Sequence, residues 1–456
     1  VGDEAGTALT TGDNNVAVGF EALKTEDAHG NNVAVGYQAL KTTNAGADGY
    51  NVAVGSLAGT AITTGLYNTL VGGAAGDALT DADFNVAIGL NALTADTLGS
   101  RSIAIGKGAL ETQNFTTATD SYNVAIGHDA GNDITTGTNN TLIGGLAGDA
   151  LTTGDQNVAV GTGALSTDDV GKFSTAIGYA ALNAQNFATA TNAYNVAVGH
   201  SAGLSVTTGV QNTLVGGLAG DAITTATDST FVGYLAGSAT TDGNHNTGIG
   251  SNALAANTGG QNTAVGRDAL AANTSASFNT AVGRSALSAN TEGNRNVAVG
   301  KDAMRANTLG SRNVAVGESA LDALNLTTAT DSYNIGVGYF AGGSMTTGLN
   351  NTLIGGLAGD AITASNDNVA VGTAALTTNT LSSENVAIGR SALQELNHTT
   401  ATDGFNVAVG SDAGKLVTTG TNNVIIGGLA GDALTDADLN VAVGDNALSA
   451  DTLGSR

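Results

Sequence analysis

The sequence has no cysteine, tryptophan or proline, and few aromatic residues of any kind. Without cysteine, no disulfide can staple the chain and no cysteine nucleophile is present. Nine Phe and nine Tyr in 456 residues, set against 67 Gly, are too few large side chains for ordinary globular cores. We therefore expect one small unit that is repeated many times.

Basic residues are also scarce, with 14 Lys and Arg against 39 Asp and Glu. An acidic surface repels phosphate groups, so we expect neither nucleic acid nor an anionic membrane as a partner. No window of 18 uninterrupted apolar residues occurs, and the opening VGDEAGTAL has no basic and apolar signal regions. Any export signal or membrane anchor is expected to lie outside this segment.

What the chain does contain is a repeat that can be aligned on a glycine. The glycine that ends strings such as NVAVG gives 26 units, and 19 of the 25 intervals between units share one length, as from Gly127 to Gly144. Most of the chain groups into blocks of three such 17-residue intervals and one 21-residue interval, which together make a 72-residue super-period. We expect residues 1–456 to form a single continuous array that is cut in mid-coil at both ends.

Three positions around the repeat glycine are nearly fixed. Val or Ile precedes it in all 26 units, Ala follows three residues after it in all 26, and Asn stands four residues before it in 22 of 25. Alternating β-branched residues such as Val16 and Val18 predict a short strand. One strand, a second apolar segment and polar turns are typical of one coil of a parallel β-solenoid, so we expect an all-β fold of about 26 coils. The repeated Asn, from Asn15 to Asn440, is expected to form a ladder of side-chain amides.

The residue after the fixed Ala follows a rule of exchange. It is Leu or Met in 14 units, which we call Leu-form, and Gly in 12, which we call Gly-form. In 11 of the 12 Gly-form units an aliphatic residue appears three positions further on, as Leu151 does after Gly148, and Thr240 is the exception. A close-packed interior tolerates neither a void nor an extra side chain. Both positions are therefore predicted to fill the same slot inside the coil.

The stretch IGGLAGDAL, Ile143 to Leu151, looks like a calcium-binding nonapeptide repeat. Its aspartate, Asp149, returns mostly once per super-period, as Asp77, Asp221, Asp360 and Asp432. Four coils at ~4.8 Å each separate such copies by ~19 Å, which is too far for a shared cation. We interpret the stretch as turn geometry and keep calcium binding as a less favoured alternative.

Motifs for other chemistry are scarce in the sequence. The GxSxG spacing occurs once, as GHSAG from Gly199 to Gly203, and both of its glycines are regular positions of a Gly-form unit. No glycine-rich loop ending in Lys-Ser/Thr is present. The five histidines are scattered, and each is expected in a solvated turn: His29, His128, His200, His245 and His398. We expect no catalytic residue, no cofactor and no metal site, and hence no enzyme.

The units NVAVGFEAL, NNVAVGYQAL and NTAVGRDALAANT resemble the head repeats of YadA-like trimeric autotransporter adhesins. They are also similar to the NTAxGxxAL repeats of phage tail fibres and bacterial surface fibres. The resemblance covers essentially the whole chain. It implies a left-handed parallel β-roll whose three chains pack around a common axis into a rigid rod. The Gly-form coils and the 21-residue intervals depart from those repeats.

The residues themselves also favour a homotrimer. If Val16 and Val18 face the interior of the coil, Ala17 between them faces outward, where solvent would favour Thr, Ser or a charge. Small apolar residues at this outward position predict contact with another chain. Once per super-period the residue is bulky, and these larger side chains are predicted to fill space along the axis that the chains share. The alternative is a single-chain roll that covers this face with its own turns. The predicted interface residues are Ala17, Leu70, Leu142, Ala159, Leu214, Ala298, Leu353 and Ile425.

The four 21-residue intervals each add four residues to one loop and hold seven of the 18 Phe and Tyr residues. We expect a row of bulges ~19 Å apart along one edge of the chain. Their aromatic rings either cover the exposed end of a coil or form a ridge that binds a ligand at several points. The candidate binding residues are Phe115, Tyr122, Phe187, Tyr194, Leu326, Tyr333, His398 and Phe405.

These features lead us to expect a structural and adhesive fibre segment, a head or shaft that attaches to carbohydrate or protein on a target surface. The expected location is extracellular, at a cell surface or on a virion. A filament of single-chain rolls is the main alternative. Ice binding is less favoured, because Thr pairs such as Thr63 and Thr64 are not continued in the neighbouring coils.

Overall fold

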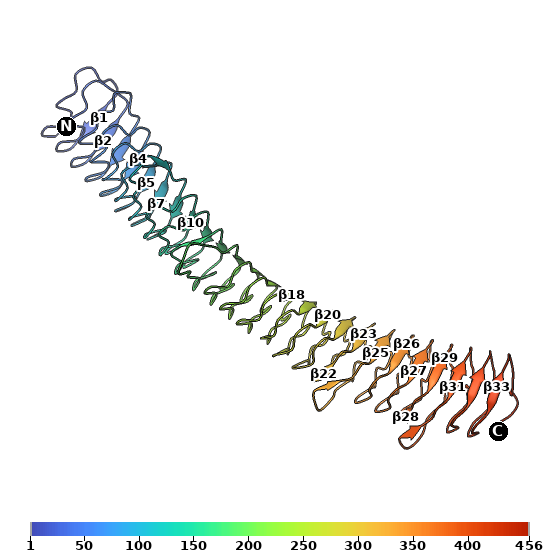
Figure 1. The fold of residues 1–456 in the computed structure, drawn as a ribbon. Helices are drawn as coiled ribbons and strands as arrows, with labels where there is room; N and C mark the ends of the chain where they lie inside the picture. Colours follow the sequence, from blue (N-terminus) through green and yellow to red (C-terminus); the bar gives the residue numbers. More distant parts are fainter. Residues whose placement is uncertain (1, 455–456) are drawn as a thin grey trace. The chain divides into compact units, whose positions relative to one another are not determined.

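The structure of the chain, a computed structural model, describes residues 2–454, which contain strands and turns but no helix. Contacts divide the chain into two compact units, residues 1–228 and 229–456. Each unit is a parallel β-solenoid in which successive coils stack on one another (Figure 1). The predicted fold class is confirmed, with 25 strands of the main type, one in each coil. The unit that ends at Gly2 includes Val1, which lies outside the described residues.

The first unit has twelve main strands of three residues, each placed just before a repeat glycine. They are β1 (Val16–Val18), β2 (Val33–Val35), β3 (Val52–Val54), β4 (Thr69–Val71), β5 (Val86–Ile88), β7 (Ile103–Ile105), β9 (Val124–Ile126), β10 (Thr141–Ile143), β11 (Val158–Val160), β13 (Thr175–Ile177), β15 (Val196–Val198) and β16 (Thr213–Val215).

The second unit has thirteen main strands of the same kind. They are β17 (Thr230–Val232), β18 (Thr247–Ile249), β19 (Thr263–Val265), β20 (Thr280–Val282), β21 (Val297–Val299), β23 (Val314–Val316), β25 (Ile335–Val337), β26 (Thr352–Ile354), β27 (Val369–Val371), β29 (Val386–Ile388), β31 (Val407–Val409), β32 (Val424–Ile426) and β33 (Val441–Val443).

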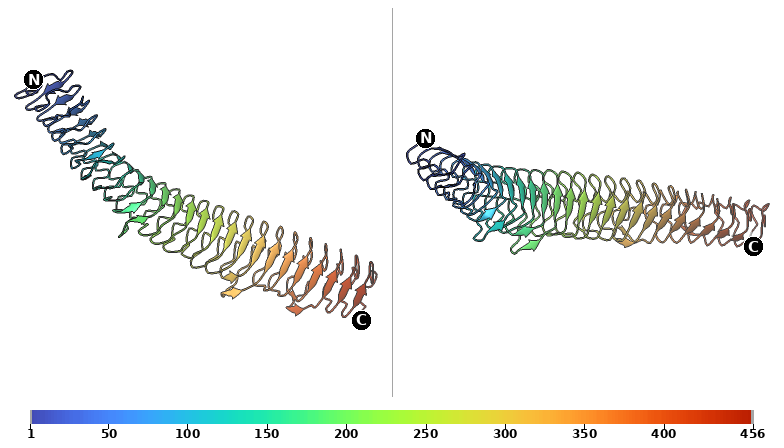
Figure 2. Two further views of the ribbon diagram at one scale, coloured as in Figure 1. Left: turned by 45° about the horizontal axis from the view of Figure 1, so that its top comes forward. Right: turned by 90° about the horizontal axis from the view of Figure 1, so that it is seen from above.

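Main strands of consecutive coils pair in parallel and in register, so equivalent residues lie next to each other. In β10 and β11, for example, Leu142 is opposite Ala159 and Ile143 is opposite Val160. Figure 2 shows from two further directions that the strands within each unit lie one above another. Four pairs of two-residue strands form beside the main strands: β6 (Gly99–Ser100) with β8 (Thr119–Asp120), β12 (Gly171–Lys172) with β14 (Thr191–Asn192), β22 (Gly310–Ser311) with β24 (Thr330–Asp331), and β28 (Ser382–Ser383) with β30 (Thr402–Asp403).

The fixed Asn and Gly residues connect one coil to the next. The Oδ1 atom of Asn140 accepts a hydrogen bond from the backbone N–H of Asn157 at 2.9 Å, and its Nδ2 donates to the carbonyl of Gly154 at 2.8 Å. These side chains are fully buried, and the predicted asparagine ladder is confirmed. Gly127 has a φ of 147°, and a Cβ there would lie 2.3 Å from the carbonyl oxygen of Gly144. Only glycine allows coils to approach this closely.

The middle residue of each main strand points into the coil. Ala159 and Leu142 are fully buried, whereas the flanking Val16 and Val18 of β1 are 45% and 42% exposed. Our prediction that the β-branched residues face inward and Ala faces outward is therefore wrong. The interior already holds the fixed Ala and the Leu of each coil, such as Ala164 and Leu165, so only a small side chain fits beneath most strands.

The residues that were predicted to form a trimer interface consequently lie inside the coils. Leu142 fills space above two glycines, since a Cβ on Gly131 or Gly148 would lie 2.7 or 2.8 Å from its methyl groups. The bulky residue of each super-period is therefore an interior filler and not a plug between chains. Of the eight, Ala17 is partly buried, and the other seven are fully buried: Leu70, Leu142, Ala159, Leu214, Ala298, Leu353 and Ile425.

The exchange rule of the sequence is confirmed, and its exception has a structural cause. A Cβ on Gly148 would lie 2.9 Å from Cδ1 of Leu151, so the two positions do share one interior slot. In the coil of Thr240, the slot is filled instead by Phe231 of β17, whose ring would lie 2.5 Å from a Cβ on Gly237. The same ring explains why Gly248, and not Ala, stands in the middle of β18.

Candidate functional surfaces

The outer face of the main strands is mainly apolar, with Thr at the first position of some strands, and its side chains are partly or fully exposed. Its two columns contain the first and third residues of each main strand, and the third is Val or Ile throughout. Ile143 and Ile177 in the first unit are 37% and 38% exposed, and Val299 and Ile354 in the second are 36% and 39% exposed. We call these residues the outer β-branched columns. Contiguous apolar surface of this kind marks an interaction site more often than a solvated face.

An exposed aromatic ladder runs through the first unit, at the position five residues before the repeat glycine. The rings of Tyr50 and Tyr67 stack with centroids 5.5 Å apart, and those of Tyr67 and Phe84 with centroids 4.9 Å apart. The guanidinium of Arg101 lies 4.8 Å from the Phe84 ring and 6.0 Å from the Tyr122 ring. Tyr122, predicted to stand on one of a row of bulges, therefore belongs to a ladder that spans five consecutive coils.

The remaining aromatic candidates at this position are also exposed. Tyr194, Tyr333 and Phe405 are 51%, 52% and 50% exposed. Tyr194 stacks on Phe173 with centroids 5.2 Å apart, and the guanidinium of Arg312 lies 5.8 Å from the Tyr333 ring. Exposed rings and guanidinium groups thus recur on both units.

The other four candidate residues of the 21-residue intervals are buried. Phe115, Phe187, Leu326 and His398 are only 5%, 4%, 6% and 7% exposed. Phe115 packs over the preceding coil, where a Cβ on Gly99 would lie 2.7 Å from its ring. This burial contradicts their assignment to a ligand-binding surface and supports the alternative that they cover a coil. The added residues are held in place because β8 and its equivalents pair with the coil before them.

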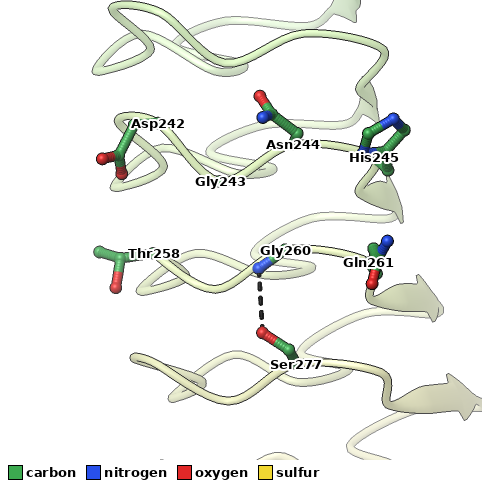
Figure 3. A pocket seen from close by; sticks show the side chains of 8 residues that line it. All are labelled: Asp242, Gly243, Asn244, His245, Thr258, Gly260, Gln261 and Ser277. Carbon is green, nitrogen blue, oxygen red and sulfur yellow. Dashed lines mark hydrogen bonds between the residues drawn. The ribbon is translucent and has the colours of Figure 1, made fainter.

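A shallow depression of about 500 Å³ lies in the second unit where the repeat is one residue short. The interval from Gly250 to Gly266 is the short one, and its turn includes Gly260, whose N–H donates to Ser277 Oγ at 3.2 Å. Polar side chains and glycines line the depression, and its lining includes no large apolar side chain that a ligand could pack against (Figure 3). The shortened interval was the only sequence signal for it. The lining residues are Asp242, Gly243, Asn244, His245, Thr258, Gly260, Gln261 and Ser277.

A buried polar network replaces the asparagine ladder at two places in the first unit. The side chain of Gln113 donates from Nε2 to Asp96 Oδ2 at 2.6 Å and to Ser102 Oγ at 2.8 Å. Asn123 donates from Nδ2 to Gln113 Oε1 at 2.9 Å. Burial raises the pKa of the Asp96 carboxyl above its ordinary value, although Gln113 and the backbone N–H groups of Phe115 and Gly99 donate to it.

The second copy of this network contains Asp168, Ser174, Gln185 and Asn195 with the same bonding pattern. Burial raises the pKa of Asp168 in the same way. Ser102, Ser174 and Ser229 replace the fixed Asn in the three units that lack it, and the first two are therefore parts of the networks. The polar residues at these places were visible in the sequence, but their burial was not anticipated.

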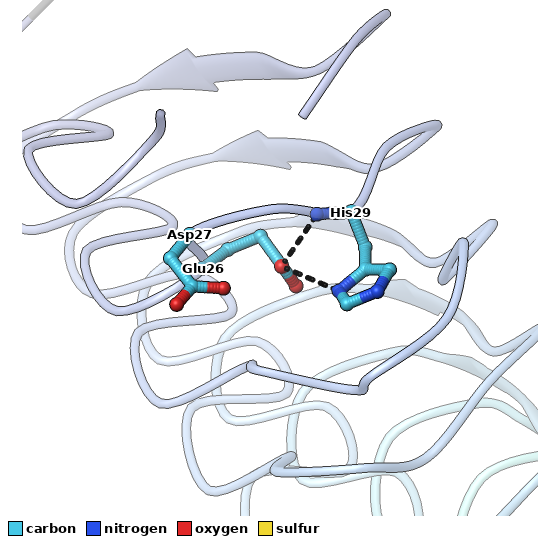
Figure 4. Close-up of side chains that lie close together, drawn as sticks. All are labelled: Glu26, Asp27 and His29. Carbon is cyan, nitrogen blue, oxygen red and sulfur yellow. Dashed lines mark hydrogen bonds and ion pairs between the residues drawn. The ribbon is translucent and has the colours of Figure 1, made fainter. Parts of the chain in front are cut away.

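Three potential metal ligands gather at one turn of the first unit. Glu26, Asp27 and His29 each offer one donor atom, and these atoms all lie within 4.8 Å of one another. The Glu26 carboxylate lies between the other two side chains (Figure 4). His29 was predicted to lie in a solvated turn, but its Nδ1 atom is buried.

The aspartates of the nonapeptide-like stretches lie apart from this group. Burial raises the pKa of Asp149, Asp221 and Asp360, and one carboxylate oxygen of each is buried without a hydrogen bond. These aspartates lie in Gly-form coils, each directly after the glycine that replaces Leu. In the coil of Asp149, this glycine is Gly148, and Leu151 fills the interior slot. The interpretation of IGGLAGDAL as coil geometry agrees with this placement.

Comparison with models of known protein families and with curated protein sequences gives no match. The likeness to adhesin and fibre repeats therefore depends on the motif itself. Within residues 2–454, no helix is long and apolar enough to span a membrane.

Proposed function

We propose that the chain is a segment of a structural and adhesive fibre, in which three copies pack around a common axis through their outer β-branched columns. The observation that carries the proposal is the partial or full exposure of these columns, which place a Val or Ile at the third position of every main strand on the outside of the coil. Burying them against other copies would remove this apolar surface from water. The number three comes from the resemblance to trimeric adhesin heads. Such a fibre would work outside a cell, at its surface or on a virion.

Carboxylates placed in the columns test this packing. The double substitution Ile143→Glu with Ile177→Glu would bury unpaired charges in the assembly but leave them partly solvated in a single chain. We expect the assembly to dissociate to single chains that keep their β-type circular dichroism, as measured by size-exclusion chromatography with light scattering.

The matched control is Thr117→Glu, which places a carboxylate in an exposed loop. The control should assemble like the wild type. Unchanged association of the double variant would rule out packing through the outer β-branched columns.

The aromatic ladder is the surface that we propose for attachment. Stacked Tyr50, Tyr67 and Phe84 with Arg101 present rings and a cation whose low flexibility suits contact with sugar rings or protein side chains. Several ladders in one assembly would add their weak contacts by avidity.

Removing two rings from the ladder tests the attachment surface. We expect Tyr67→Ser with Phe84→Ser to weaken binding to glycan and extracellular-matrix protein arrays by at least about tenfold, because exposed aromatic anchors dominate such contacts. The control is Tyr234→Ser, which removes an exposed ring outside the ladder. If the double variant binds as the control does, the ladder is not the attachment surface.

A further inference from the structure

The coil that follows Gly19 departs from all other coils at two positions. The tenth residue after the repeat glycine is Gly, Ala or Ser in the other 18 coils of the common length, but here it is His29. The seventh residue is Glu in no other coil, and here it is Glu26. Other coils also carry a carboxylate at the seventh position, as Asp96 and Asp168, so the feature that sets this coil apart is a longer carboxylate together with a histidine at the tenth position.

Glu26 is fully buried and only half satisfied. Its Oε1 atom accepts the backbone N–H of His29 at 3.1 Å and lies 3.5 Å from His29 Nδ1. Its Oε2 atom is buried and makes no hydrogen bond, and the same holds for His29 Nδ1. The ammonium of Lys24 nearby is paired with Glu4 and Glu21. A buried carboxylate oxygen without a donor is costly, and a cation bound beside Glu26 and His29 would remove this cost.

We propose that Glu26, Asp27 and His29 form a binding site for a divalent transition-metal ion of the zinc type. Ligands at ~2.0–2.2 Å from a tetrahedral ion lie roughly 3.3–3.6 Å apart. The 3.5 Å between Glu26 Oε1 and His29 Nδ1 fits this edge, and the exposed Asp27 has room to approach. One imidazole and two carboxylates favour zinc over calcium, which prefers oxygen ligands alone, and they leave a fourth position for water.

The neighbouring coil supplies a further polar group. Thr43 holds the seventh position in the next coil, and its Oγ1 atom is also buried without a hydrogen bond. Seventh residues of consecutive coils contact each other elsewhere, as Asp96 and Gln113 do. The Thr43 hydroxyl is thus placed to support the site from the side of the next coil. The site is independent of the proposed fibre function.

Two substitutions remove the ligands but restore residues that the repeat uses elsewhere. Glu26→Asn introduces the residue found at the seventh position as Asn290 and Asn307, and His29→Gly introduces the residue found at the tenth position as Gly99. Isothermal titration of the full chain with zinc chloride at neutral pH should show one tight site per chain. Each substitution should weaken that site by at least about tenfold.

The control is His128→Ala, which removes an exposed histidine whose Nδ1 lies 2.9 Å from Asp129 Oδ2. It should leave the tight site unchanged, and calcium chloride should not compete with zinc. Equal zinc affinity in the wild type and both ligand variants would overturn the proposal. If a variant misfolds, zinc-edge X-ray absorption of the wild type decides, since the site requires one imidazole in a shell of nitrogen and oxygen at ~2.0–2.2 Å.

Discussion

One interior slot of each coil is filled from different sequence positions in different coils. Leu165 fills it directly after the fixed Ala, Leu151 fills it from three residues further on, and Phe231 fills it from the strand. Strand residues such as Leu142 complete the filling where two Gly-form coils follow each other. The volume of side chains inside each coil therefore stays nearly constant, although the sequence position of the residue that fills the slot changes.

The Phe231 coil can be converted to the common Gly-form arrangement. Thr240→Ile alone should overpack the slot and lower the free energy of unfolding by about 1–3 kcal/mol. Phe231→Leu alone should leave a cavity with a similar loss. The double variant should regain most of the wild-type stability in urea unfolding, since it copies the Leu142, Gly148 and Leu151 set. Losses that simply add in the double variant would show that the two positions do not share a slot.

At the scale of the coil, polar residues in the interior change as a set. The first unit combines Asp96, Ser102 and Gln113, whereas the second has Asn307, Asn313 and Leu324 at the equivalent places. Ser102 leaves room for the Gln113 amide and accepts its hydrogen bond at 2.8 Å. The uncharged set avoids a buried carboxylate.

Transplanting the uncharged set should stabilise the first unit. The triple variant Asp96→Asn, Ser102→Asn and Gln113→Leu should gain about 1–4 kcal/mol at neutral pH. Burial raises the pKa of Asp96, so the folded chain holds this proton more tightly than the unfolded chain. The resulting stabilisation of the wild type is present below the ordinary carboxyl pKa and is lost as the pH rises through the raised value.

The gain of the triple variant over the wild type should therefore be larger near pH 7.5 than near pH 4, as measured by thermal melting. The single variant Asp96→Asn is the control, and it should gain less because the Gln113 amide then faces another amide. An equal gain at both pH values would show that the Asp96 carboxyl does not titrate abnormally.

Periodicity was enough to predict the coil, its length and the Asn ladder, because these depend on residues fixed in nearly every unit. The direction of the strand was predicted wrongly from the same residues. Val16 and Ala17 are both apolar, so their alternation alone does not show which face is inside. The burial of Glu26 was missed, and the burial of Phe115 was only one of two alternatives, because both depend on contacts with the neighbouring coil.

At the scale of the whole molecule, the proposed fibre depends on the outer β-branched columns. The chain is acidic, with 39 acidic and 14 basic residues. This net negative charge favours solubility of the assembly, but it does not attract one copy of the chain to another. In the proposed fibre, association therefore depends on apolar contact through the columns, whose third position is Val or Ile in every main strand. Exposed aromatic and Arg residues beside them remain available for a target surface.

The most direct test of the fibre proposal is the molar mass of the unaltered chain in solution, measured by sedimentation equilibrium at neutral pH and physiological salt. We predict a single species of three times the chain mass of 44.3 kDa, with β-type circular dichroism. A folded species of 44.3 kDa that stays monomeric at increasing concentration would contradict the proposal.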